Sequence, residues 1–183
     1  MRSGPTPLLW LYGPSGVGKS TVGWDLLRQL SEAGVPTAYL DADQLGLAWD
    51  PPGDDPDQHR LKAANLGALW PHYRAAGARC LIFTGCVEDR DTARHYAAQV
   101  PGAALTLCRL RARADTLRSR ILRRGRQTHR AEEVVRQAPL LDRDDFGDLT
   151  VDTDDLPVAE VARRVRQAAG DRFGLAPGEG SGR

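Results

Sequence analysis

Short apolar runs alternate along the chain with longer segments in which apolar residues recur every three or four positions. The runs suit buried strands and predict them at residues 8–12, 35–40, 79–84, 103–108 and 148–152. The longer segments predict helices at residues 21–33, 57–76, 88–98, 113–124, 131–141 and 157–169. Strands that alternate with helices predict an α/β fold with a parallel sheet covered on both faces, whose ligands bind beyond the carboxyl ends of the strands.

The connection between the first strand and the first helix contains the G-x-x-x-x-G-K-S pattern of a phosphate-binding P-loop. Its nucleotide-binding candidates are Gly13, Pro14, Ser15, Gly16, Val17, Gly18, Lys19, Ser20 and Thr21. Glycines let the backbone curl around a phosphate, and the start of the helix adds its positive end at the same place. Lys19 is then expected to reach the β- and γ-phosphates, and the Ser20 hydroxyl to bind Mg²⁺.

An ATP site also needs a carboxylate that orients Mg²⁺, and the third strand ends at Thr84 and Gly85 without one. The second strand ends at Asp41, and Asp43 follows two residues later. In an extended segment these two side chains point to the same side. We therefore expect Asp41 to hold Mg²⁺ through water and Asp43, one step further out, to accept the proton of an acceptor hydroxyl. The alternative is an acidic corner, because aspartate is common in turns.

Composition limits the partners and the location. The chain has 183 residues, 41% of them hydrophobic, and a net charge of +1, so there is no overall basic field for nucleic acid or a membrane surface. No signal peptide or membrane span is recognised, and Cys80, Cys86 and Cys108 are expected to be buried thiols in a reducing cytoplasm. We expect one domain over residues 1–173 and a disordered, glycine-rich tail over residues 174–183.

Four features resemble the small P-loop kinases, the group of shikimate kinase, gluconate kinase, adenylylsulfate kinase and chloramphenicol phosphotransferase. They are the P-loop, the two aspartates after the second strand, the strand end at residues 83–85, and an arginine-rich segment followed by residues 151–153 before the last helix. The resemblance spans about residues 8–170. It implies a three-layer α/β/α P-loop NTPase with a five-stranded parallel sheet of the nucleoside-monophosphate-kinase type.

The resemblance also implies roles for single residues on the acceptor side. By likeness to shikimate kinase and adenylylsulfate kinase, Asp43 contacts the acceptor and Asp41 belongs to the metal shell. Thr84 and Gly85 correspond to substrate-binding glycines of shikimate kinase, but Cys86 and the residue after it replace the next glycines, which argues against shikimate itself. The P-loop sequence also resembles that of guanylate kinase, but this chain lacks the guanine-nucleotide-binding motif of that enzyme.

The arginine-rich segment, residues 109–130, lies where this kinase group has a mobile lid over the nucleotide. By that likeness the lid covers about residues 120–130 with a hinge at Gly125, and its arginines stabilise charge on the transferring phosphoryl group. The candidates to approach the phosphates are Arg113, Arg120, Arg124 and Arg130, of which we take Arg120 and Arg124 as catalytic. For any single arginine the alternative is a solvated helix face in an arginine-rich chain.

Arg60 opens the helix behind the acidic loop that follows the second strand. If this helix start faces the carboxyl edge of the sheet, Arg60 suits a carboxylate or phosphate on the acceptor. A surface helix face is the alternative.

These features predict an ATP-dependent phosphotransferase, a kinase that moves the γ-phosphoryl group of ATP to a hydroxyl of a small molecule. Its cofactors are ATP and Mg²⁺, and its partner is the small-molecule acceptor, with no membrane or nucleic acid, in a cytoplasmic monomer or homodimer. Two alternatives stay open: a kinase for the 5′-hydroxyl of a nucleotide or nucleic acid, and a regulatory or resistance module that binds ATP without transfer. Against nucleic acid, the arginine-rich segment lacks aromatic residues for base stacking.

Overall fold

The sheet at the centre of the molecule has five parallel strands. The computed structural model describes residues 4–48, 53–125, 129, 131–143 and 145–170. The strands are β1 (Thr6–Tyr12), β2 (Thr37–Asp41), β3 (Cys80–Thr84), β4 (Ala103–Arg111) and β5 (Leu149–Asp152). Their order is β2-β3-β1-β4-β5, and every neighbouring pair is parallel. The predicted five-stranded parallel sheet is therefore confirmed, whereas the tail at residues 174–183 lies outside the described residues.

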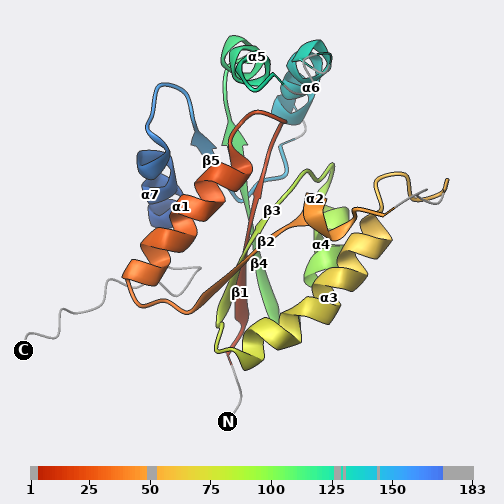
Figure 1. Cartoon of the computed structure of the whole chain (residues 1–183), viewed down its shortest axis with the longest axis vertical. Helices are drawn as coiled ribbons and strands as arrows, with labels where there is room; N and C mark the ends of the chain where they lie inside the picture. Colours follow the sequence, from red (N-terminus) through yellow and green to blue (C-terminus); the bar gives the residue numbers. More distant parts are fainter. Residues whose placement is uncertain (1–3, 49–52, 126–128, 130, 144, 171–183) are drawn as a thin grey trace, which may run out of the picture.

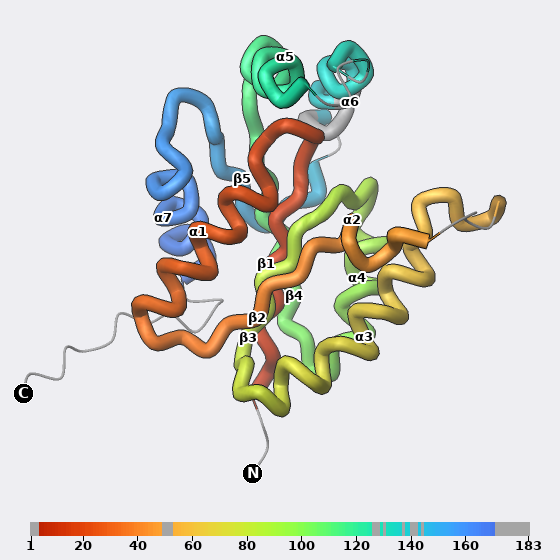
Figure 2. The backbone as a smooth tube through the Cα atoms, viewed as in Figure 1, coloured from red at the N-terminus to blue at the C-terminus, as the bar shows by residue number. Residues whose placement is uncertain are grey.

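Helices cover both faces of the sheet, which gives the predicted three layers (Figure 1). One face carries α1 (Lys19–Glu32) and α7 (Val158–Ala169), and the other carries α3 (His59–Ala75) and α4 (Arg90–Ala97). Beyond the carboxyl ends of the strands, at the top of Figure 2, lie α5 (Ala114–Arg123) and α6 (Ala131–Arg143). None of the helices in the described part of the chain has the length and apolar character that a membrane crossing requires.

The central strand β1 is buried on both faces, because its side chains alternate between two apolar clusters. Leu9 and Leu11 pack into the cluster that includes α1 and α7. Leu8, Trp10 and Tyr12 pack into the cluster under α3 and α4. A strand covered on both sides needs apolar residues at every position, which explains the continuous apolar run in the sequence.

A short helix that the sequence did not predict follows β2 directly. This helix, α2 (Ala42–Leu45), begins after Asp41, whose side chain accepts a hydrogen bond from the backbone N–H of Asp43 at 3.0 Å. Asp41 thus caps the helix, a role that aspartate performs well. The expectation that Asp41 and Asp43 share an extended segment is wrong, because a helix of four residues is too short to show a helical period in the sequence.

The start of α3 also differs from its predicted position. The helix begins at His59, two residues later than expected, because the Asp55 carboxylate accepts the backbone N–H groups of His59 at 2.8 Å and Arg60 at 3.1 Å. Gln58, between them, has a left-handed backbone with φ 57° and ψ 35°. This conformation interrupts the helix on its N-terminal side, and Asp57 therefore lies in the loop before α3.

β4 is longer than predicted and takes the first residues of the arginine-rich segment. It extends to Arg111, so the segment begins as strand rather than as lid. Arg109, near the end of β4, is only 2% exposed, and its guanidinium lies 3.7 Å from the Asp145 carboxylate. Arg109 is therefore a buried residue of the sheet.

Candidate nucleotide and acceptor site

The predicted P-loop joins the carboxyl end of central strand β1 to the start of α1. Gly13 has φ 141°, and a Cβ atom there would lie 2.4 Å from the carbonyl oxygen of Leu110 in β4, so only glycine fits. Gly18, with φ 107° and ψ 18°, is the N-cap of α1 and provides no side-chain cap. The first N–H groups of α1 can therefore serve an anion, which the positive end of the helix also favours.

The side chain of Lys19 folds back over the P-loop. Its Nζ atom donates hydrogen bonds to the carbonyl oxygens of Gly13 at 3.0 Å and Pro14 at 3.3 Å. Charged phosphate oxygens are stronger acceptors for an ammonium group than neutral carbonyls. The lysine is thus placed where a bound phosphate would take over its hydrogen bonds.

Asp41 gathers hydrogen-bond donors from three separate elements. Its Oδ2 atom accepts from the Ser20 hydroxyl at 2.8 Å and from the Thr84 hydroxyl at 3.0 Å. The Tyr39 hydroxyl lies 3.5 Å from the same oxygen and 3.0 Å from the Thr84 hydroxyl. Burial raises the pKa of Tyr39, and the nearby Asp41 charge adds to this, so the phenol keeps its proton. The carboxylate is therefore held beside Ser20 before any ligand arrives.

Gly23 allows α1 to approach the sheet closely enough for this contact. A Cβ atom at Gly23 would lie 2.7 Å from Cε2 of Tyr39 and 2.8 Å from Cγ2 of Thr84. Glycine inside a helix costs about 0.5–1 kcal/mol relative to alanine, so its presence here reflects the close packing. Sequence reasoning missed both Gly23 and Tyr39; the glycine in the middle of an apolar helix was the one available signal.

Ser20 and Asp41 together fit a magnesium ion. A hydroxyl and a carboxylate are hard oxygen donors of the kind that Mg²⁺ prefers, and Mg²⁺ usually keeps several waters beside one or two protein ligands. The two side chains are hydrogen-bonded to each other at 2.8 Å, directly beside the P-loop. The donor set at this position is therefore suitable for the ion that accompanies a nucleotide.

Asp43 is placed differently from the prediction, although it remains close to Asp41. It lies in the first turn of α2 with an exposed side chain, and its backbone N–H is bonded to Asp41. The carboxylates therefore do not point along one side of a strand. The helical turn instead leaves the Asp43 carboxylate open to solvent, where a small molecule can reach it.

Thr84 and Gly85, expected by resemblance to contact the acceptor, are both buried. The Thr84 side chain has no exposed surface and its hydroxyl supports Asp41. A Cβ atom at Gly85 would lie 2.6 Å from Cβ of Ala42, so glycine is required for β3 to end against α2. Both residues therefore expose little surface that a small molecule could contact.

The arginines of α5 flank an open cleft next to the P-loop. Arg120 donates to the carbonyl oxygen of Val17 at 3.1 Å and to the carbonyl oxygen of Thr153 at 2.8 Å. It thus joins the P-loop to the connection between β5 and α7. The cleft, of about 550 Å³, is lined by Arg113, Arg120, Arg123, Leu156 and four further residues. Arg124, the other catalytic candidate, is exposed at the C-cap of α5.

Two further arginines predicted for the site have other partners. Arg113 pairs with Asp155 at 2.8 Å, and its side chain lies near Asp154 as well. Arg60 pairs with Asp54 at 2.9 Å and lies 3.7 Å from Asp55. Of the predicted lid, Gly125 is described with φ 64°, whereas Arg130 and residues 126–128 lie outside the described residues.

The prediction of three buried thiols is correct for two of them. Cys80 and Cys108 are buried, but Cys86 is exposed. Its Sγ atom lies 3.8 Å from the carbonyl oxygen of Gly13, because the loop after β3 passes beside the P-loop. This thiol therefore stands at the candidate phosphate site.

The family model described as an AAA domain matches residues 8–143 of this chain. The chain belongs to this AAA domain family. The matched region contains the P-loop, Asp41 and Asp43, α5 and α6, whereas β5 and α7 lie beyond it. No curated protein sequence matches the chain.

Solved structures similar to this AAA domain include several small P-loop kinases. A gluconokinase from Sinorhizobium meliloti has a TM-score of 0.62 and 19% identity over 94% of each chain. A tunicamycin resistance protein from Deinococcus radiodurans has a TM-score of 0.67 and 23% identity over 90% of this chain and 96% of its own. An APS kinase from Mycobacterium tuberculosis, solved with AMPPNP and APS, has a TM-score of 0.58 and 20% identity over 90% of this chain and 98% of its own. The chain therefore resembles small P-loop kinases in structure, as predicted, and at these identities the likeness establishes the fold alone.

Proposed function

We propose that the protein is an ATP-dependent phosphotransferase that moves the γ-phosphoryl group of ATP to a hydroxyl of a small molecule. The observation that carries the proposal is the hydrogen bond of 2.8 Å between Ser20, at the start of α1, and Asp41, at the end of β2. It brings a P-loop hydroxyl and a carboxylate together at the edge where phosphates would bind. Phosphoryl transfer requires mainly positioning and charge stabilisation from the protein, and these groups provide both.

On the nucleotide side, each group has a separate task. The N–H groups at the start of α1 and the Lys19 ammonium bind the phosphates. Ser20 would hold Mg²⁺, and Asp41, whose Oδ2 atom accepts hydrogen bonds from Ser20 and Thr84, would support the ion through water. When bound, this ion neutralises charge on the β- and γ-phosphates.

The cleft beside α5 is our candidate for the nucleotide base and sugar. Arg120 lines this cleft and donates a hydrogen bond to the Val17 carbonyl of the P-loop, so the cleft lies close to the phosphate-binding candidates. Because its guanidinium is already bonded to Val17 and Thr153, we assign Arg120 the positioning of the P-loop. Arg124, which is exposed, is the better candidate for contact with the transferring phosphoryl group.

On the acceptor side, Asp43 is the candidate general base. Its exposed carboxylate accepts the proton of the acceptor hydroxyl while that oxygen forms a bond to the γ-phosphorus and the bond from phosphorus to the leaving ADP oxygen breaks. The names of the neighbours, which include a gluconokinase and a tunicamycin resistance protein, support a search among both metabolites and antibiotics. ATP and Mg²⁺ are abundant in the cytoplasm, where we place the reaction.

The test is ATP consumption with Mg²⁺ across a panel of hydroxylated metabolites and antibiotics. At least one compound should raise ATP consumption above the rate without acceptor and should appear as its phosphate ester by mass spectrometry. Lys19→Ala serves as the control, because it removes the phosphate-binding cation and should lower the acceptor-dependent rate by roughly a hundredfold or more. Acceptor-dependent phosphorylation at the wild-type rate in Lys19→Ala would contradict the proposed site.

A further inference from the structure

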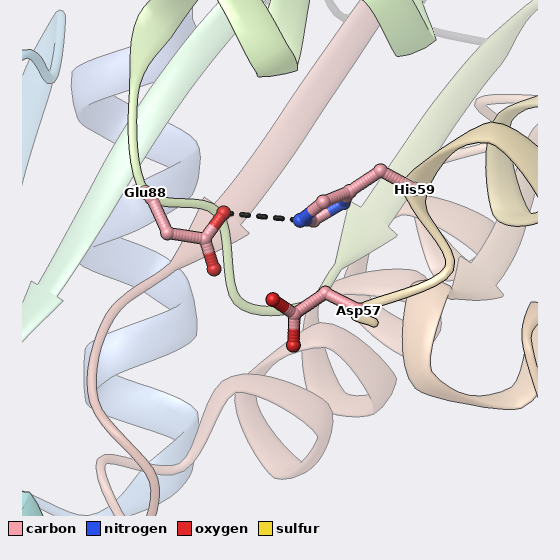
Figure 3. A group of neighbouring side chains, drawn as sticks. All are labelled: Asp57, His59 and Glu88. Carbon is pink, nitrogen blue, oxygen red and sulfur yellow. Dashed lines mark ion pairs between the residues drawn. The ribbon is translucent and has the colours of Figure 1, made fainter. Parts of the chain in front are cut away.

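A second group of possible metal ligands lies on the α3 side of the molecule, apart from Ser20 and Asp41. Asp57, His59 and Glu88 each offer one ligand atom, and the three atoms lie within 4.8 Å of one another. His59 Nε2 is 3.1 Å from Glu88 Oε2, and the Asp57 carboxylate approaches the same space (Figure 3). The group joins two segments, because Asp57 and His59 flank the start of α3 whereas Glu88 belongs to the loop between β3 and α4.

A buried tyrosine fixes the orientation of the imidazole. The Nδ1 atom of His59 lies 2.9 Å from the hydroxyl of Tyr96, a residue of α4 that is 1% exposed. The Tyr96 hydroxyl can accept the proton of Nδ1. An ion that takes the place of the proton between Nε2 and Glu88 would then meet the lone pair of Nε2. Metal-binding histidines are commonly held by such a partner on the other ring nitrogen.

The start of α3 is held in place without any ligand. The Asp55 carboxylate, 9% exposed, accepts the backbone N–H groups of His59 and Arg60 at 2.8 and 3.1 Å. The Glu88 side chain is 59% exposed and Asp57 is exposed as well, so an ion can enter from solvent. The imidazole of His59 is therefore held in position by the protein, and the two carboxylates remain accessible to an ion from solvent.

We propose that Asp57, His59 and Glu88 bind a divalent transition-metal ion of the Zn²⁺ type. Imidazole nitrogen together with carboxylate oxygen favours such ions, whereas Mg²⁺ selects oxygen ligands alone. Two carboxylates offset the charge of the ion, and three protein ligands leave at least one coordination position for water. The bound ion fastens the start of α3 to the loop after β3. The proposal does not depend on the kinase reaction.

The experiment is a titration of the untagged, full-length protein with Co²⁺, after treatment with EDTA and without nucleotide. The visible absorption of protein-bound Co²⁺ should saturate at one equivalent. Zn²⁺ should displace the signal and an excess of Mg²⁺ should not. His59→Gln and Glu88→Gln should each weaken binding roughly tenfold or more, and Tyr96→Phe about tenfold, as expected for loss of a ligand or of its supporting partner.

Two control variants separate this site from other histidines and from the nucleotide site. His72→Gln changes an exposed histidine near the other end of α3 and should bind Co²⁺ as the wild type does. Lys19→Ala should also bind normally, so failure of the kinase proposal would not affect this result. Glu88 is exposed, so Glu88→Gln remains informative even if another variant folds poorly. Absence of Co²⁺ binding in the wild type, or undiminished binding in both His59→Gln and Glu88→Gln, would overturn the proposal.

Discussion

Replacement of Gly23 by alanine tests whether α1 is held against the sheet as tightly as the candidate site requires. At an open helical position this change stabilises a protein by about 0.5–1 kcal/mol. Here the added Cβ atom would lie 2.7 Å from the Tyr39 ring and 2.8 Å from the Thr84 methyl group. Carbon atoms pack best at about 3.5–4.0 Å, so the ring, the methyl group or the helix must move.

The two effects oppose each other, and their magnitudes decide the sign. Overpacking a core typically costs about 1–3 kcal/mol, which exceeds the gain in helix propensity. We therefore expect Gly23→Ala to lower the free energy of unfolding by roughly 0–2.5 kcal/mol, the difference between these ranges. Because the shift also moves the start of α1, it should lengthen the 2.8 Å contact between Ser20 and Asp41 and raise the Mg²⁺ concentration needed for ATP binding.

Urea unfolding and ATP binding at several Mg²⁺ concentrations measure both consequences. Gly67→Ala is the matched control, because it lies inside α3 and its Cβ atom would meet the Cβ atom of Gln99 at 3.3 Å, which requires a much smaller shift. It should change stability little and leave ATP binding unchanged. If Gly23→Ala instead stabilises the protein by about 1 kcal/mol, as at an open position, with unaltered Mg²⁺ dependence, the close packing is not a requirement of the site.

Three further predictions concern single side chains. Lys19→Ala should reduce kcat/KM for ATP by an amount equivalent to about 3 kcal/mol, the usual loss of a charge-stabilising donor, and wild-type turnover would contradict the P-loop assignment. Asp41→Asn should raise the Mg²⁺ concentration needed for activity. Asp43→Asn should lower kcat by roughly 10²–10⁴-fold and leave ATP binding intact. If both variants lose ATP binding to the same extent, Asp43 is not an acceptor residue. Iodoacetamide should label Cys86 in the native protein and an ATP analogue with Mg²⁺ should protect it, because its Sγ atom lies 3.8 Å from the Gly13 carbonyl. Burial raises the pKa of the Cys108 thiol to about 12, so labelling of Cys108 at the rate of Cys86 would refute the described packing.

The features that depend on local sequence were predicted well. β1, the P-loop and α1 are adjacent in the chain, so one glycine pattern and its two flanking apolar segments identify all three. The central strands β1 and β3 are short, mainly apolar runs, and a run such as Leu8 to Tyr12 leaves no polar face that could lie outside the core. The end of β4 was harder to predict, as Arg109 shows. The sequence alone does not distinguish an arginine that is buried in a strand from one that is exposed on a helix.

The features that depend on contacts between distant residues were not visible in the sequence. Asp41 caps the helix α2 by accepting a hydrogen bond from the backbone N–H of Asp43, and no sequence periodicity records this contact. Thr84 can donate a hydrogen bond to Asp41 because β2 and β3 are paired with these two residues side by side. Such pairing cannot be predicted from the sequence of either strand alone. Arg60 illustrates the same limit, since its partners Asp54 and Asp55 were not expected to face it.

The two candidate ion sites differ in chemistry, and this difference affects how the proposed phosphotransfer should be assayed. Ser20 and Asp41 offer oxygen alone, whereas the group around His59 adds a nitrogen ligand. Mn²⁺ or Co²⁺ can accompany a nucleotide in place of Mg²⁺ but would also enter the second site, so such assays mix two effects. Mg²⁺ with and without added Zn²⁺ separates them. If the second ion acts on the acceptor side, Zn²⁺ should change the turnover of the wild type and not that of His59→Gln; an equal change in both proteins would exclude the group around His59 as the cause.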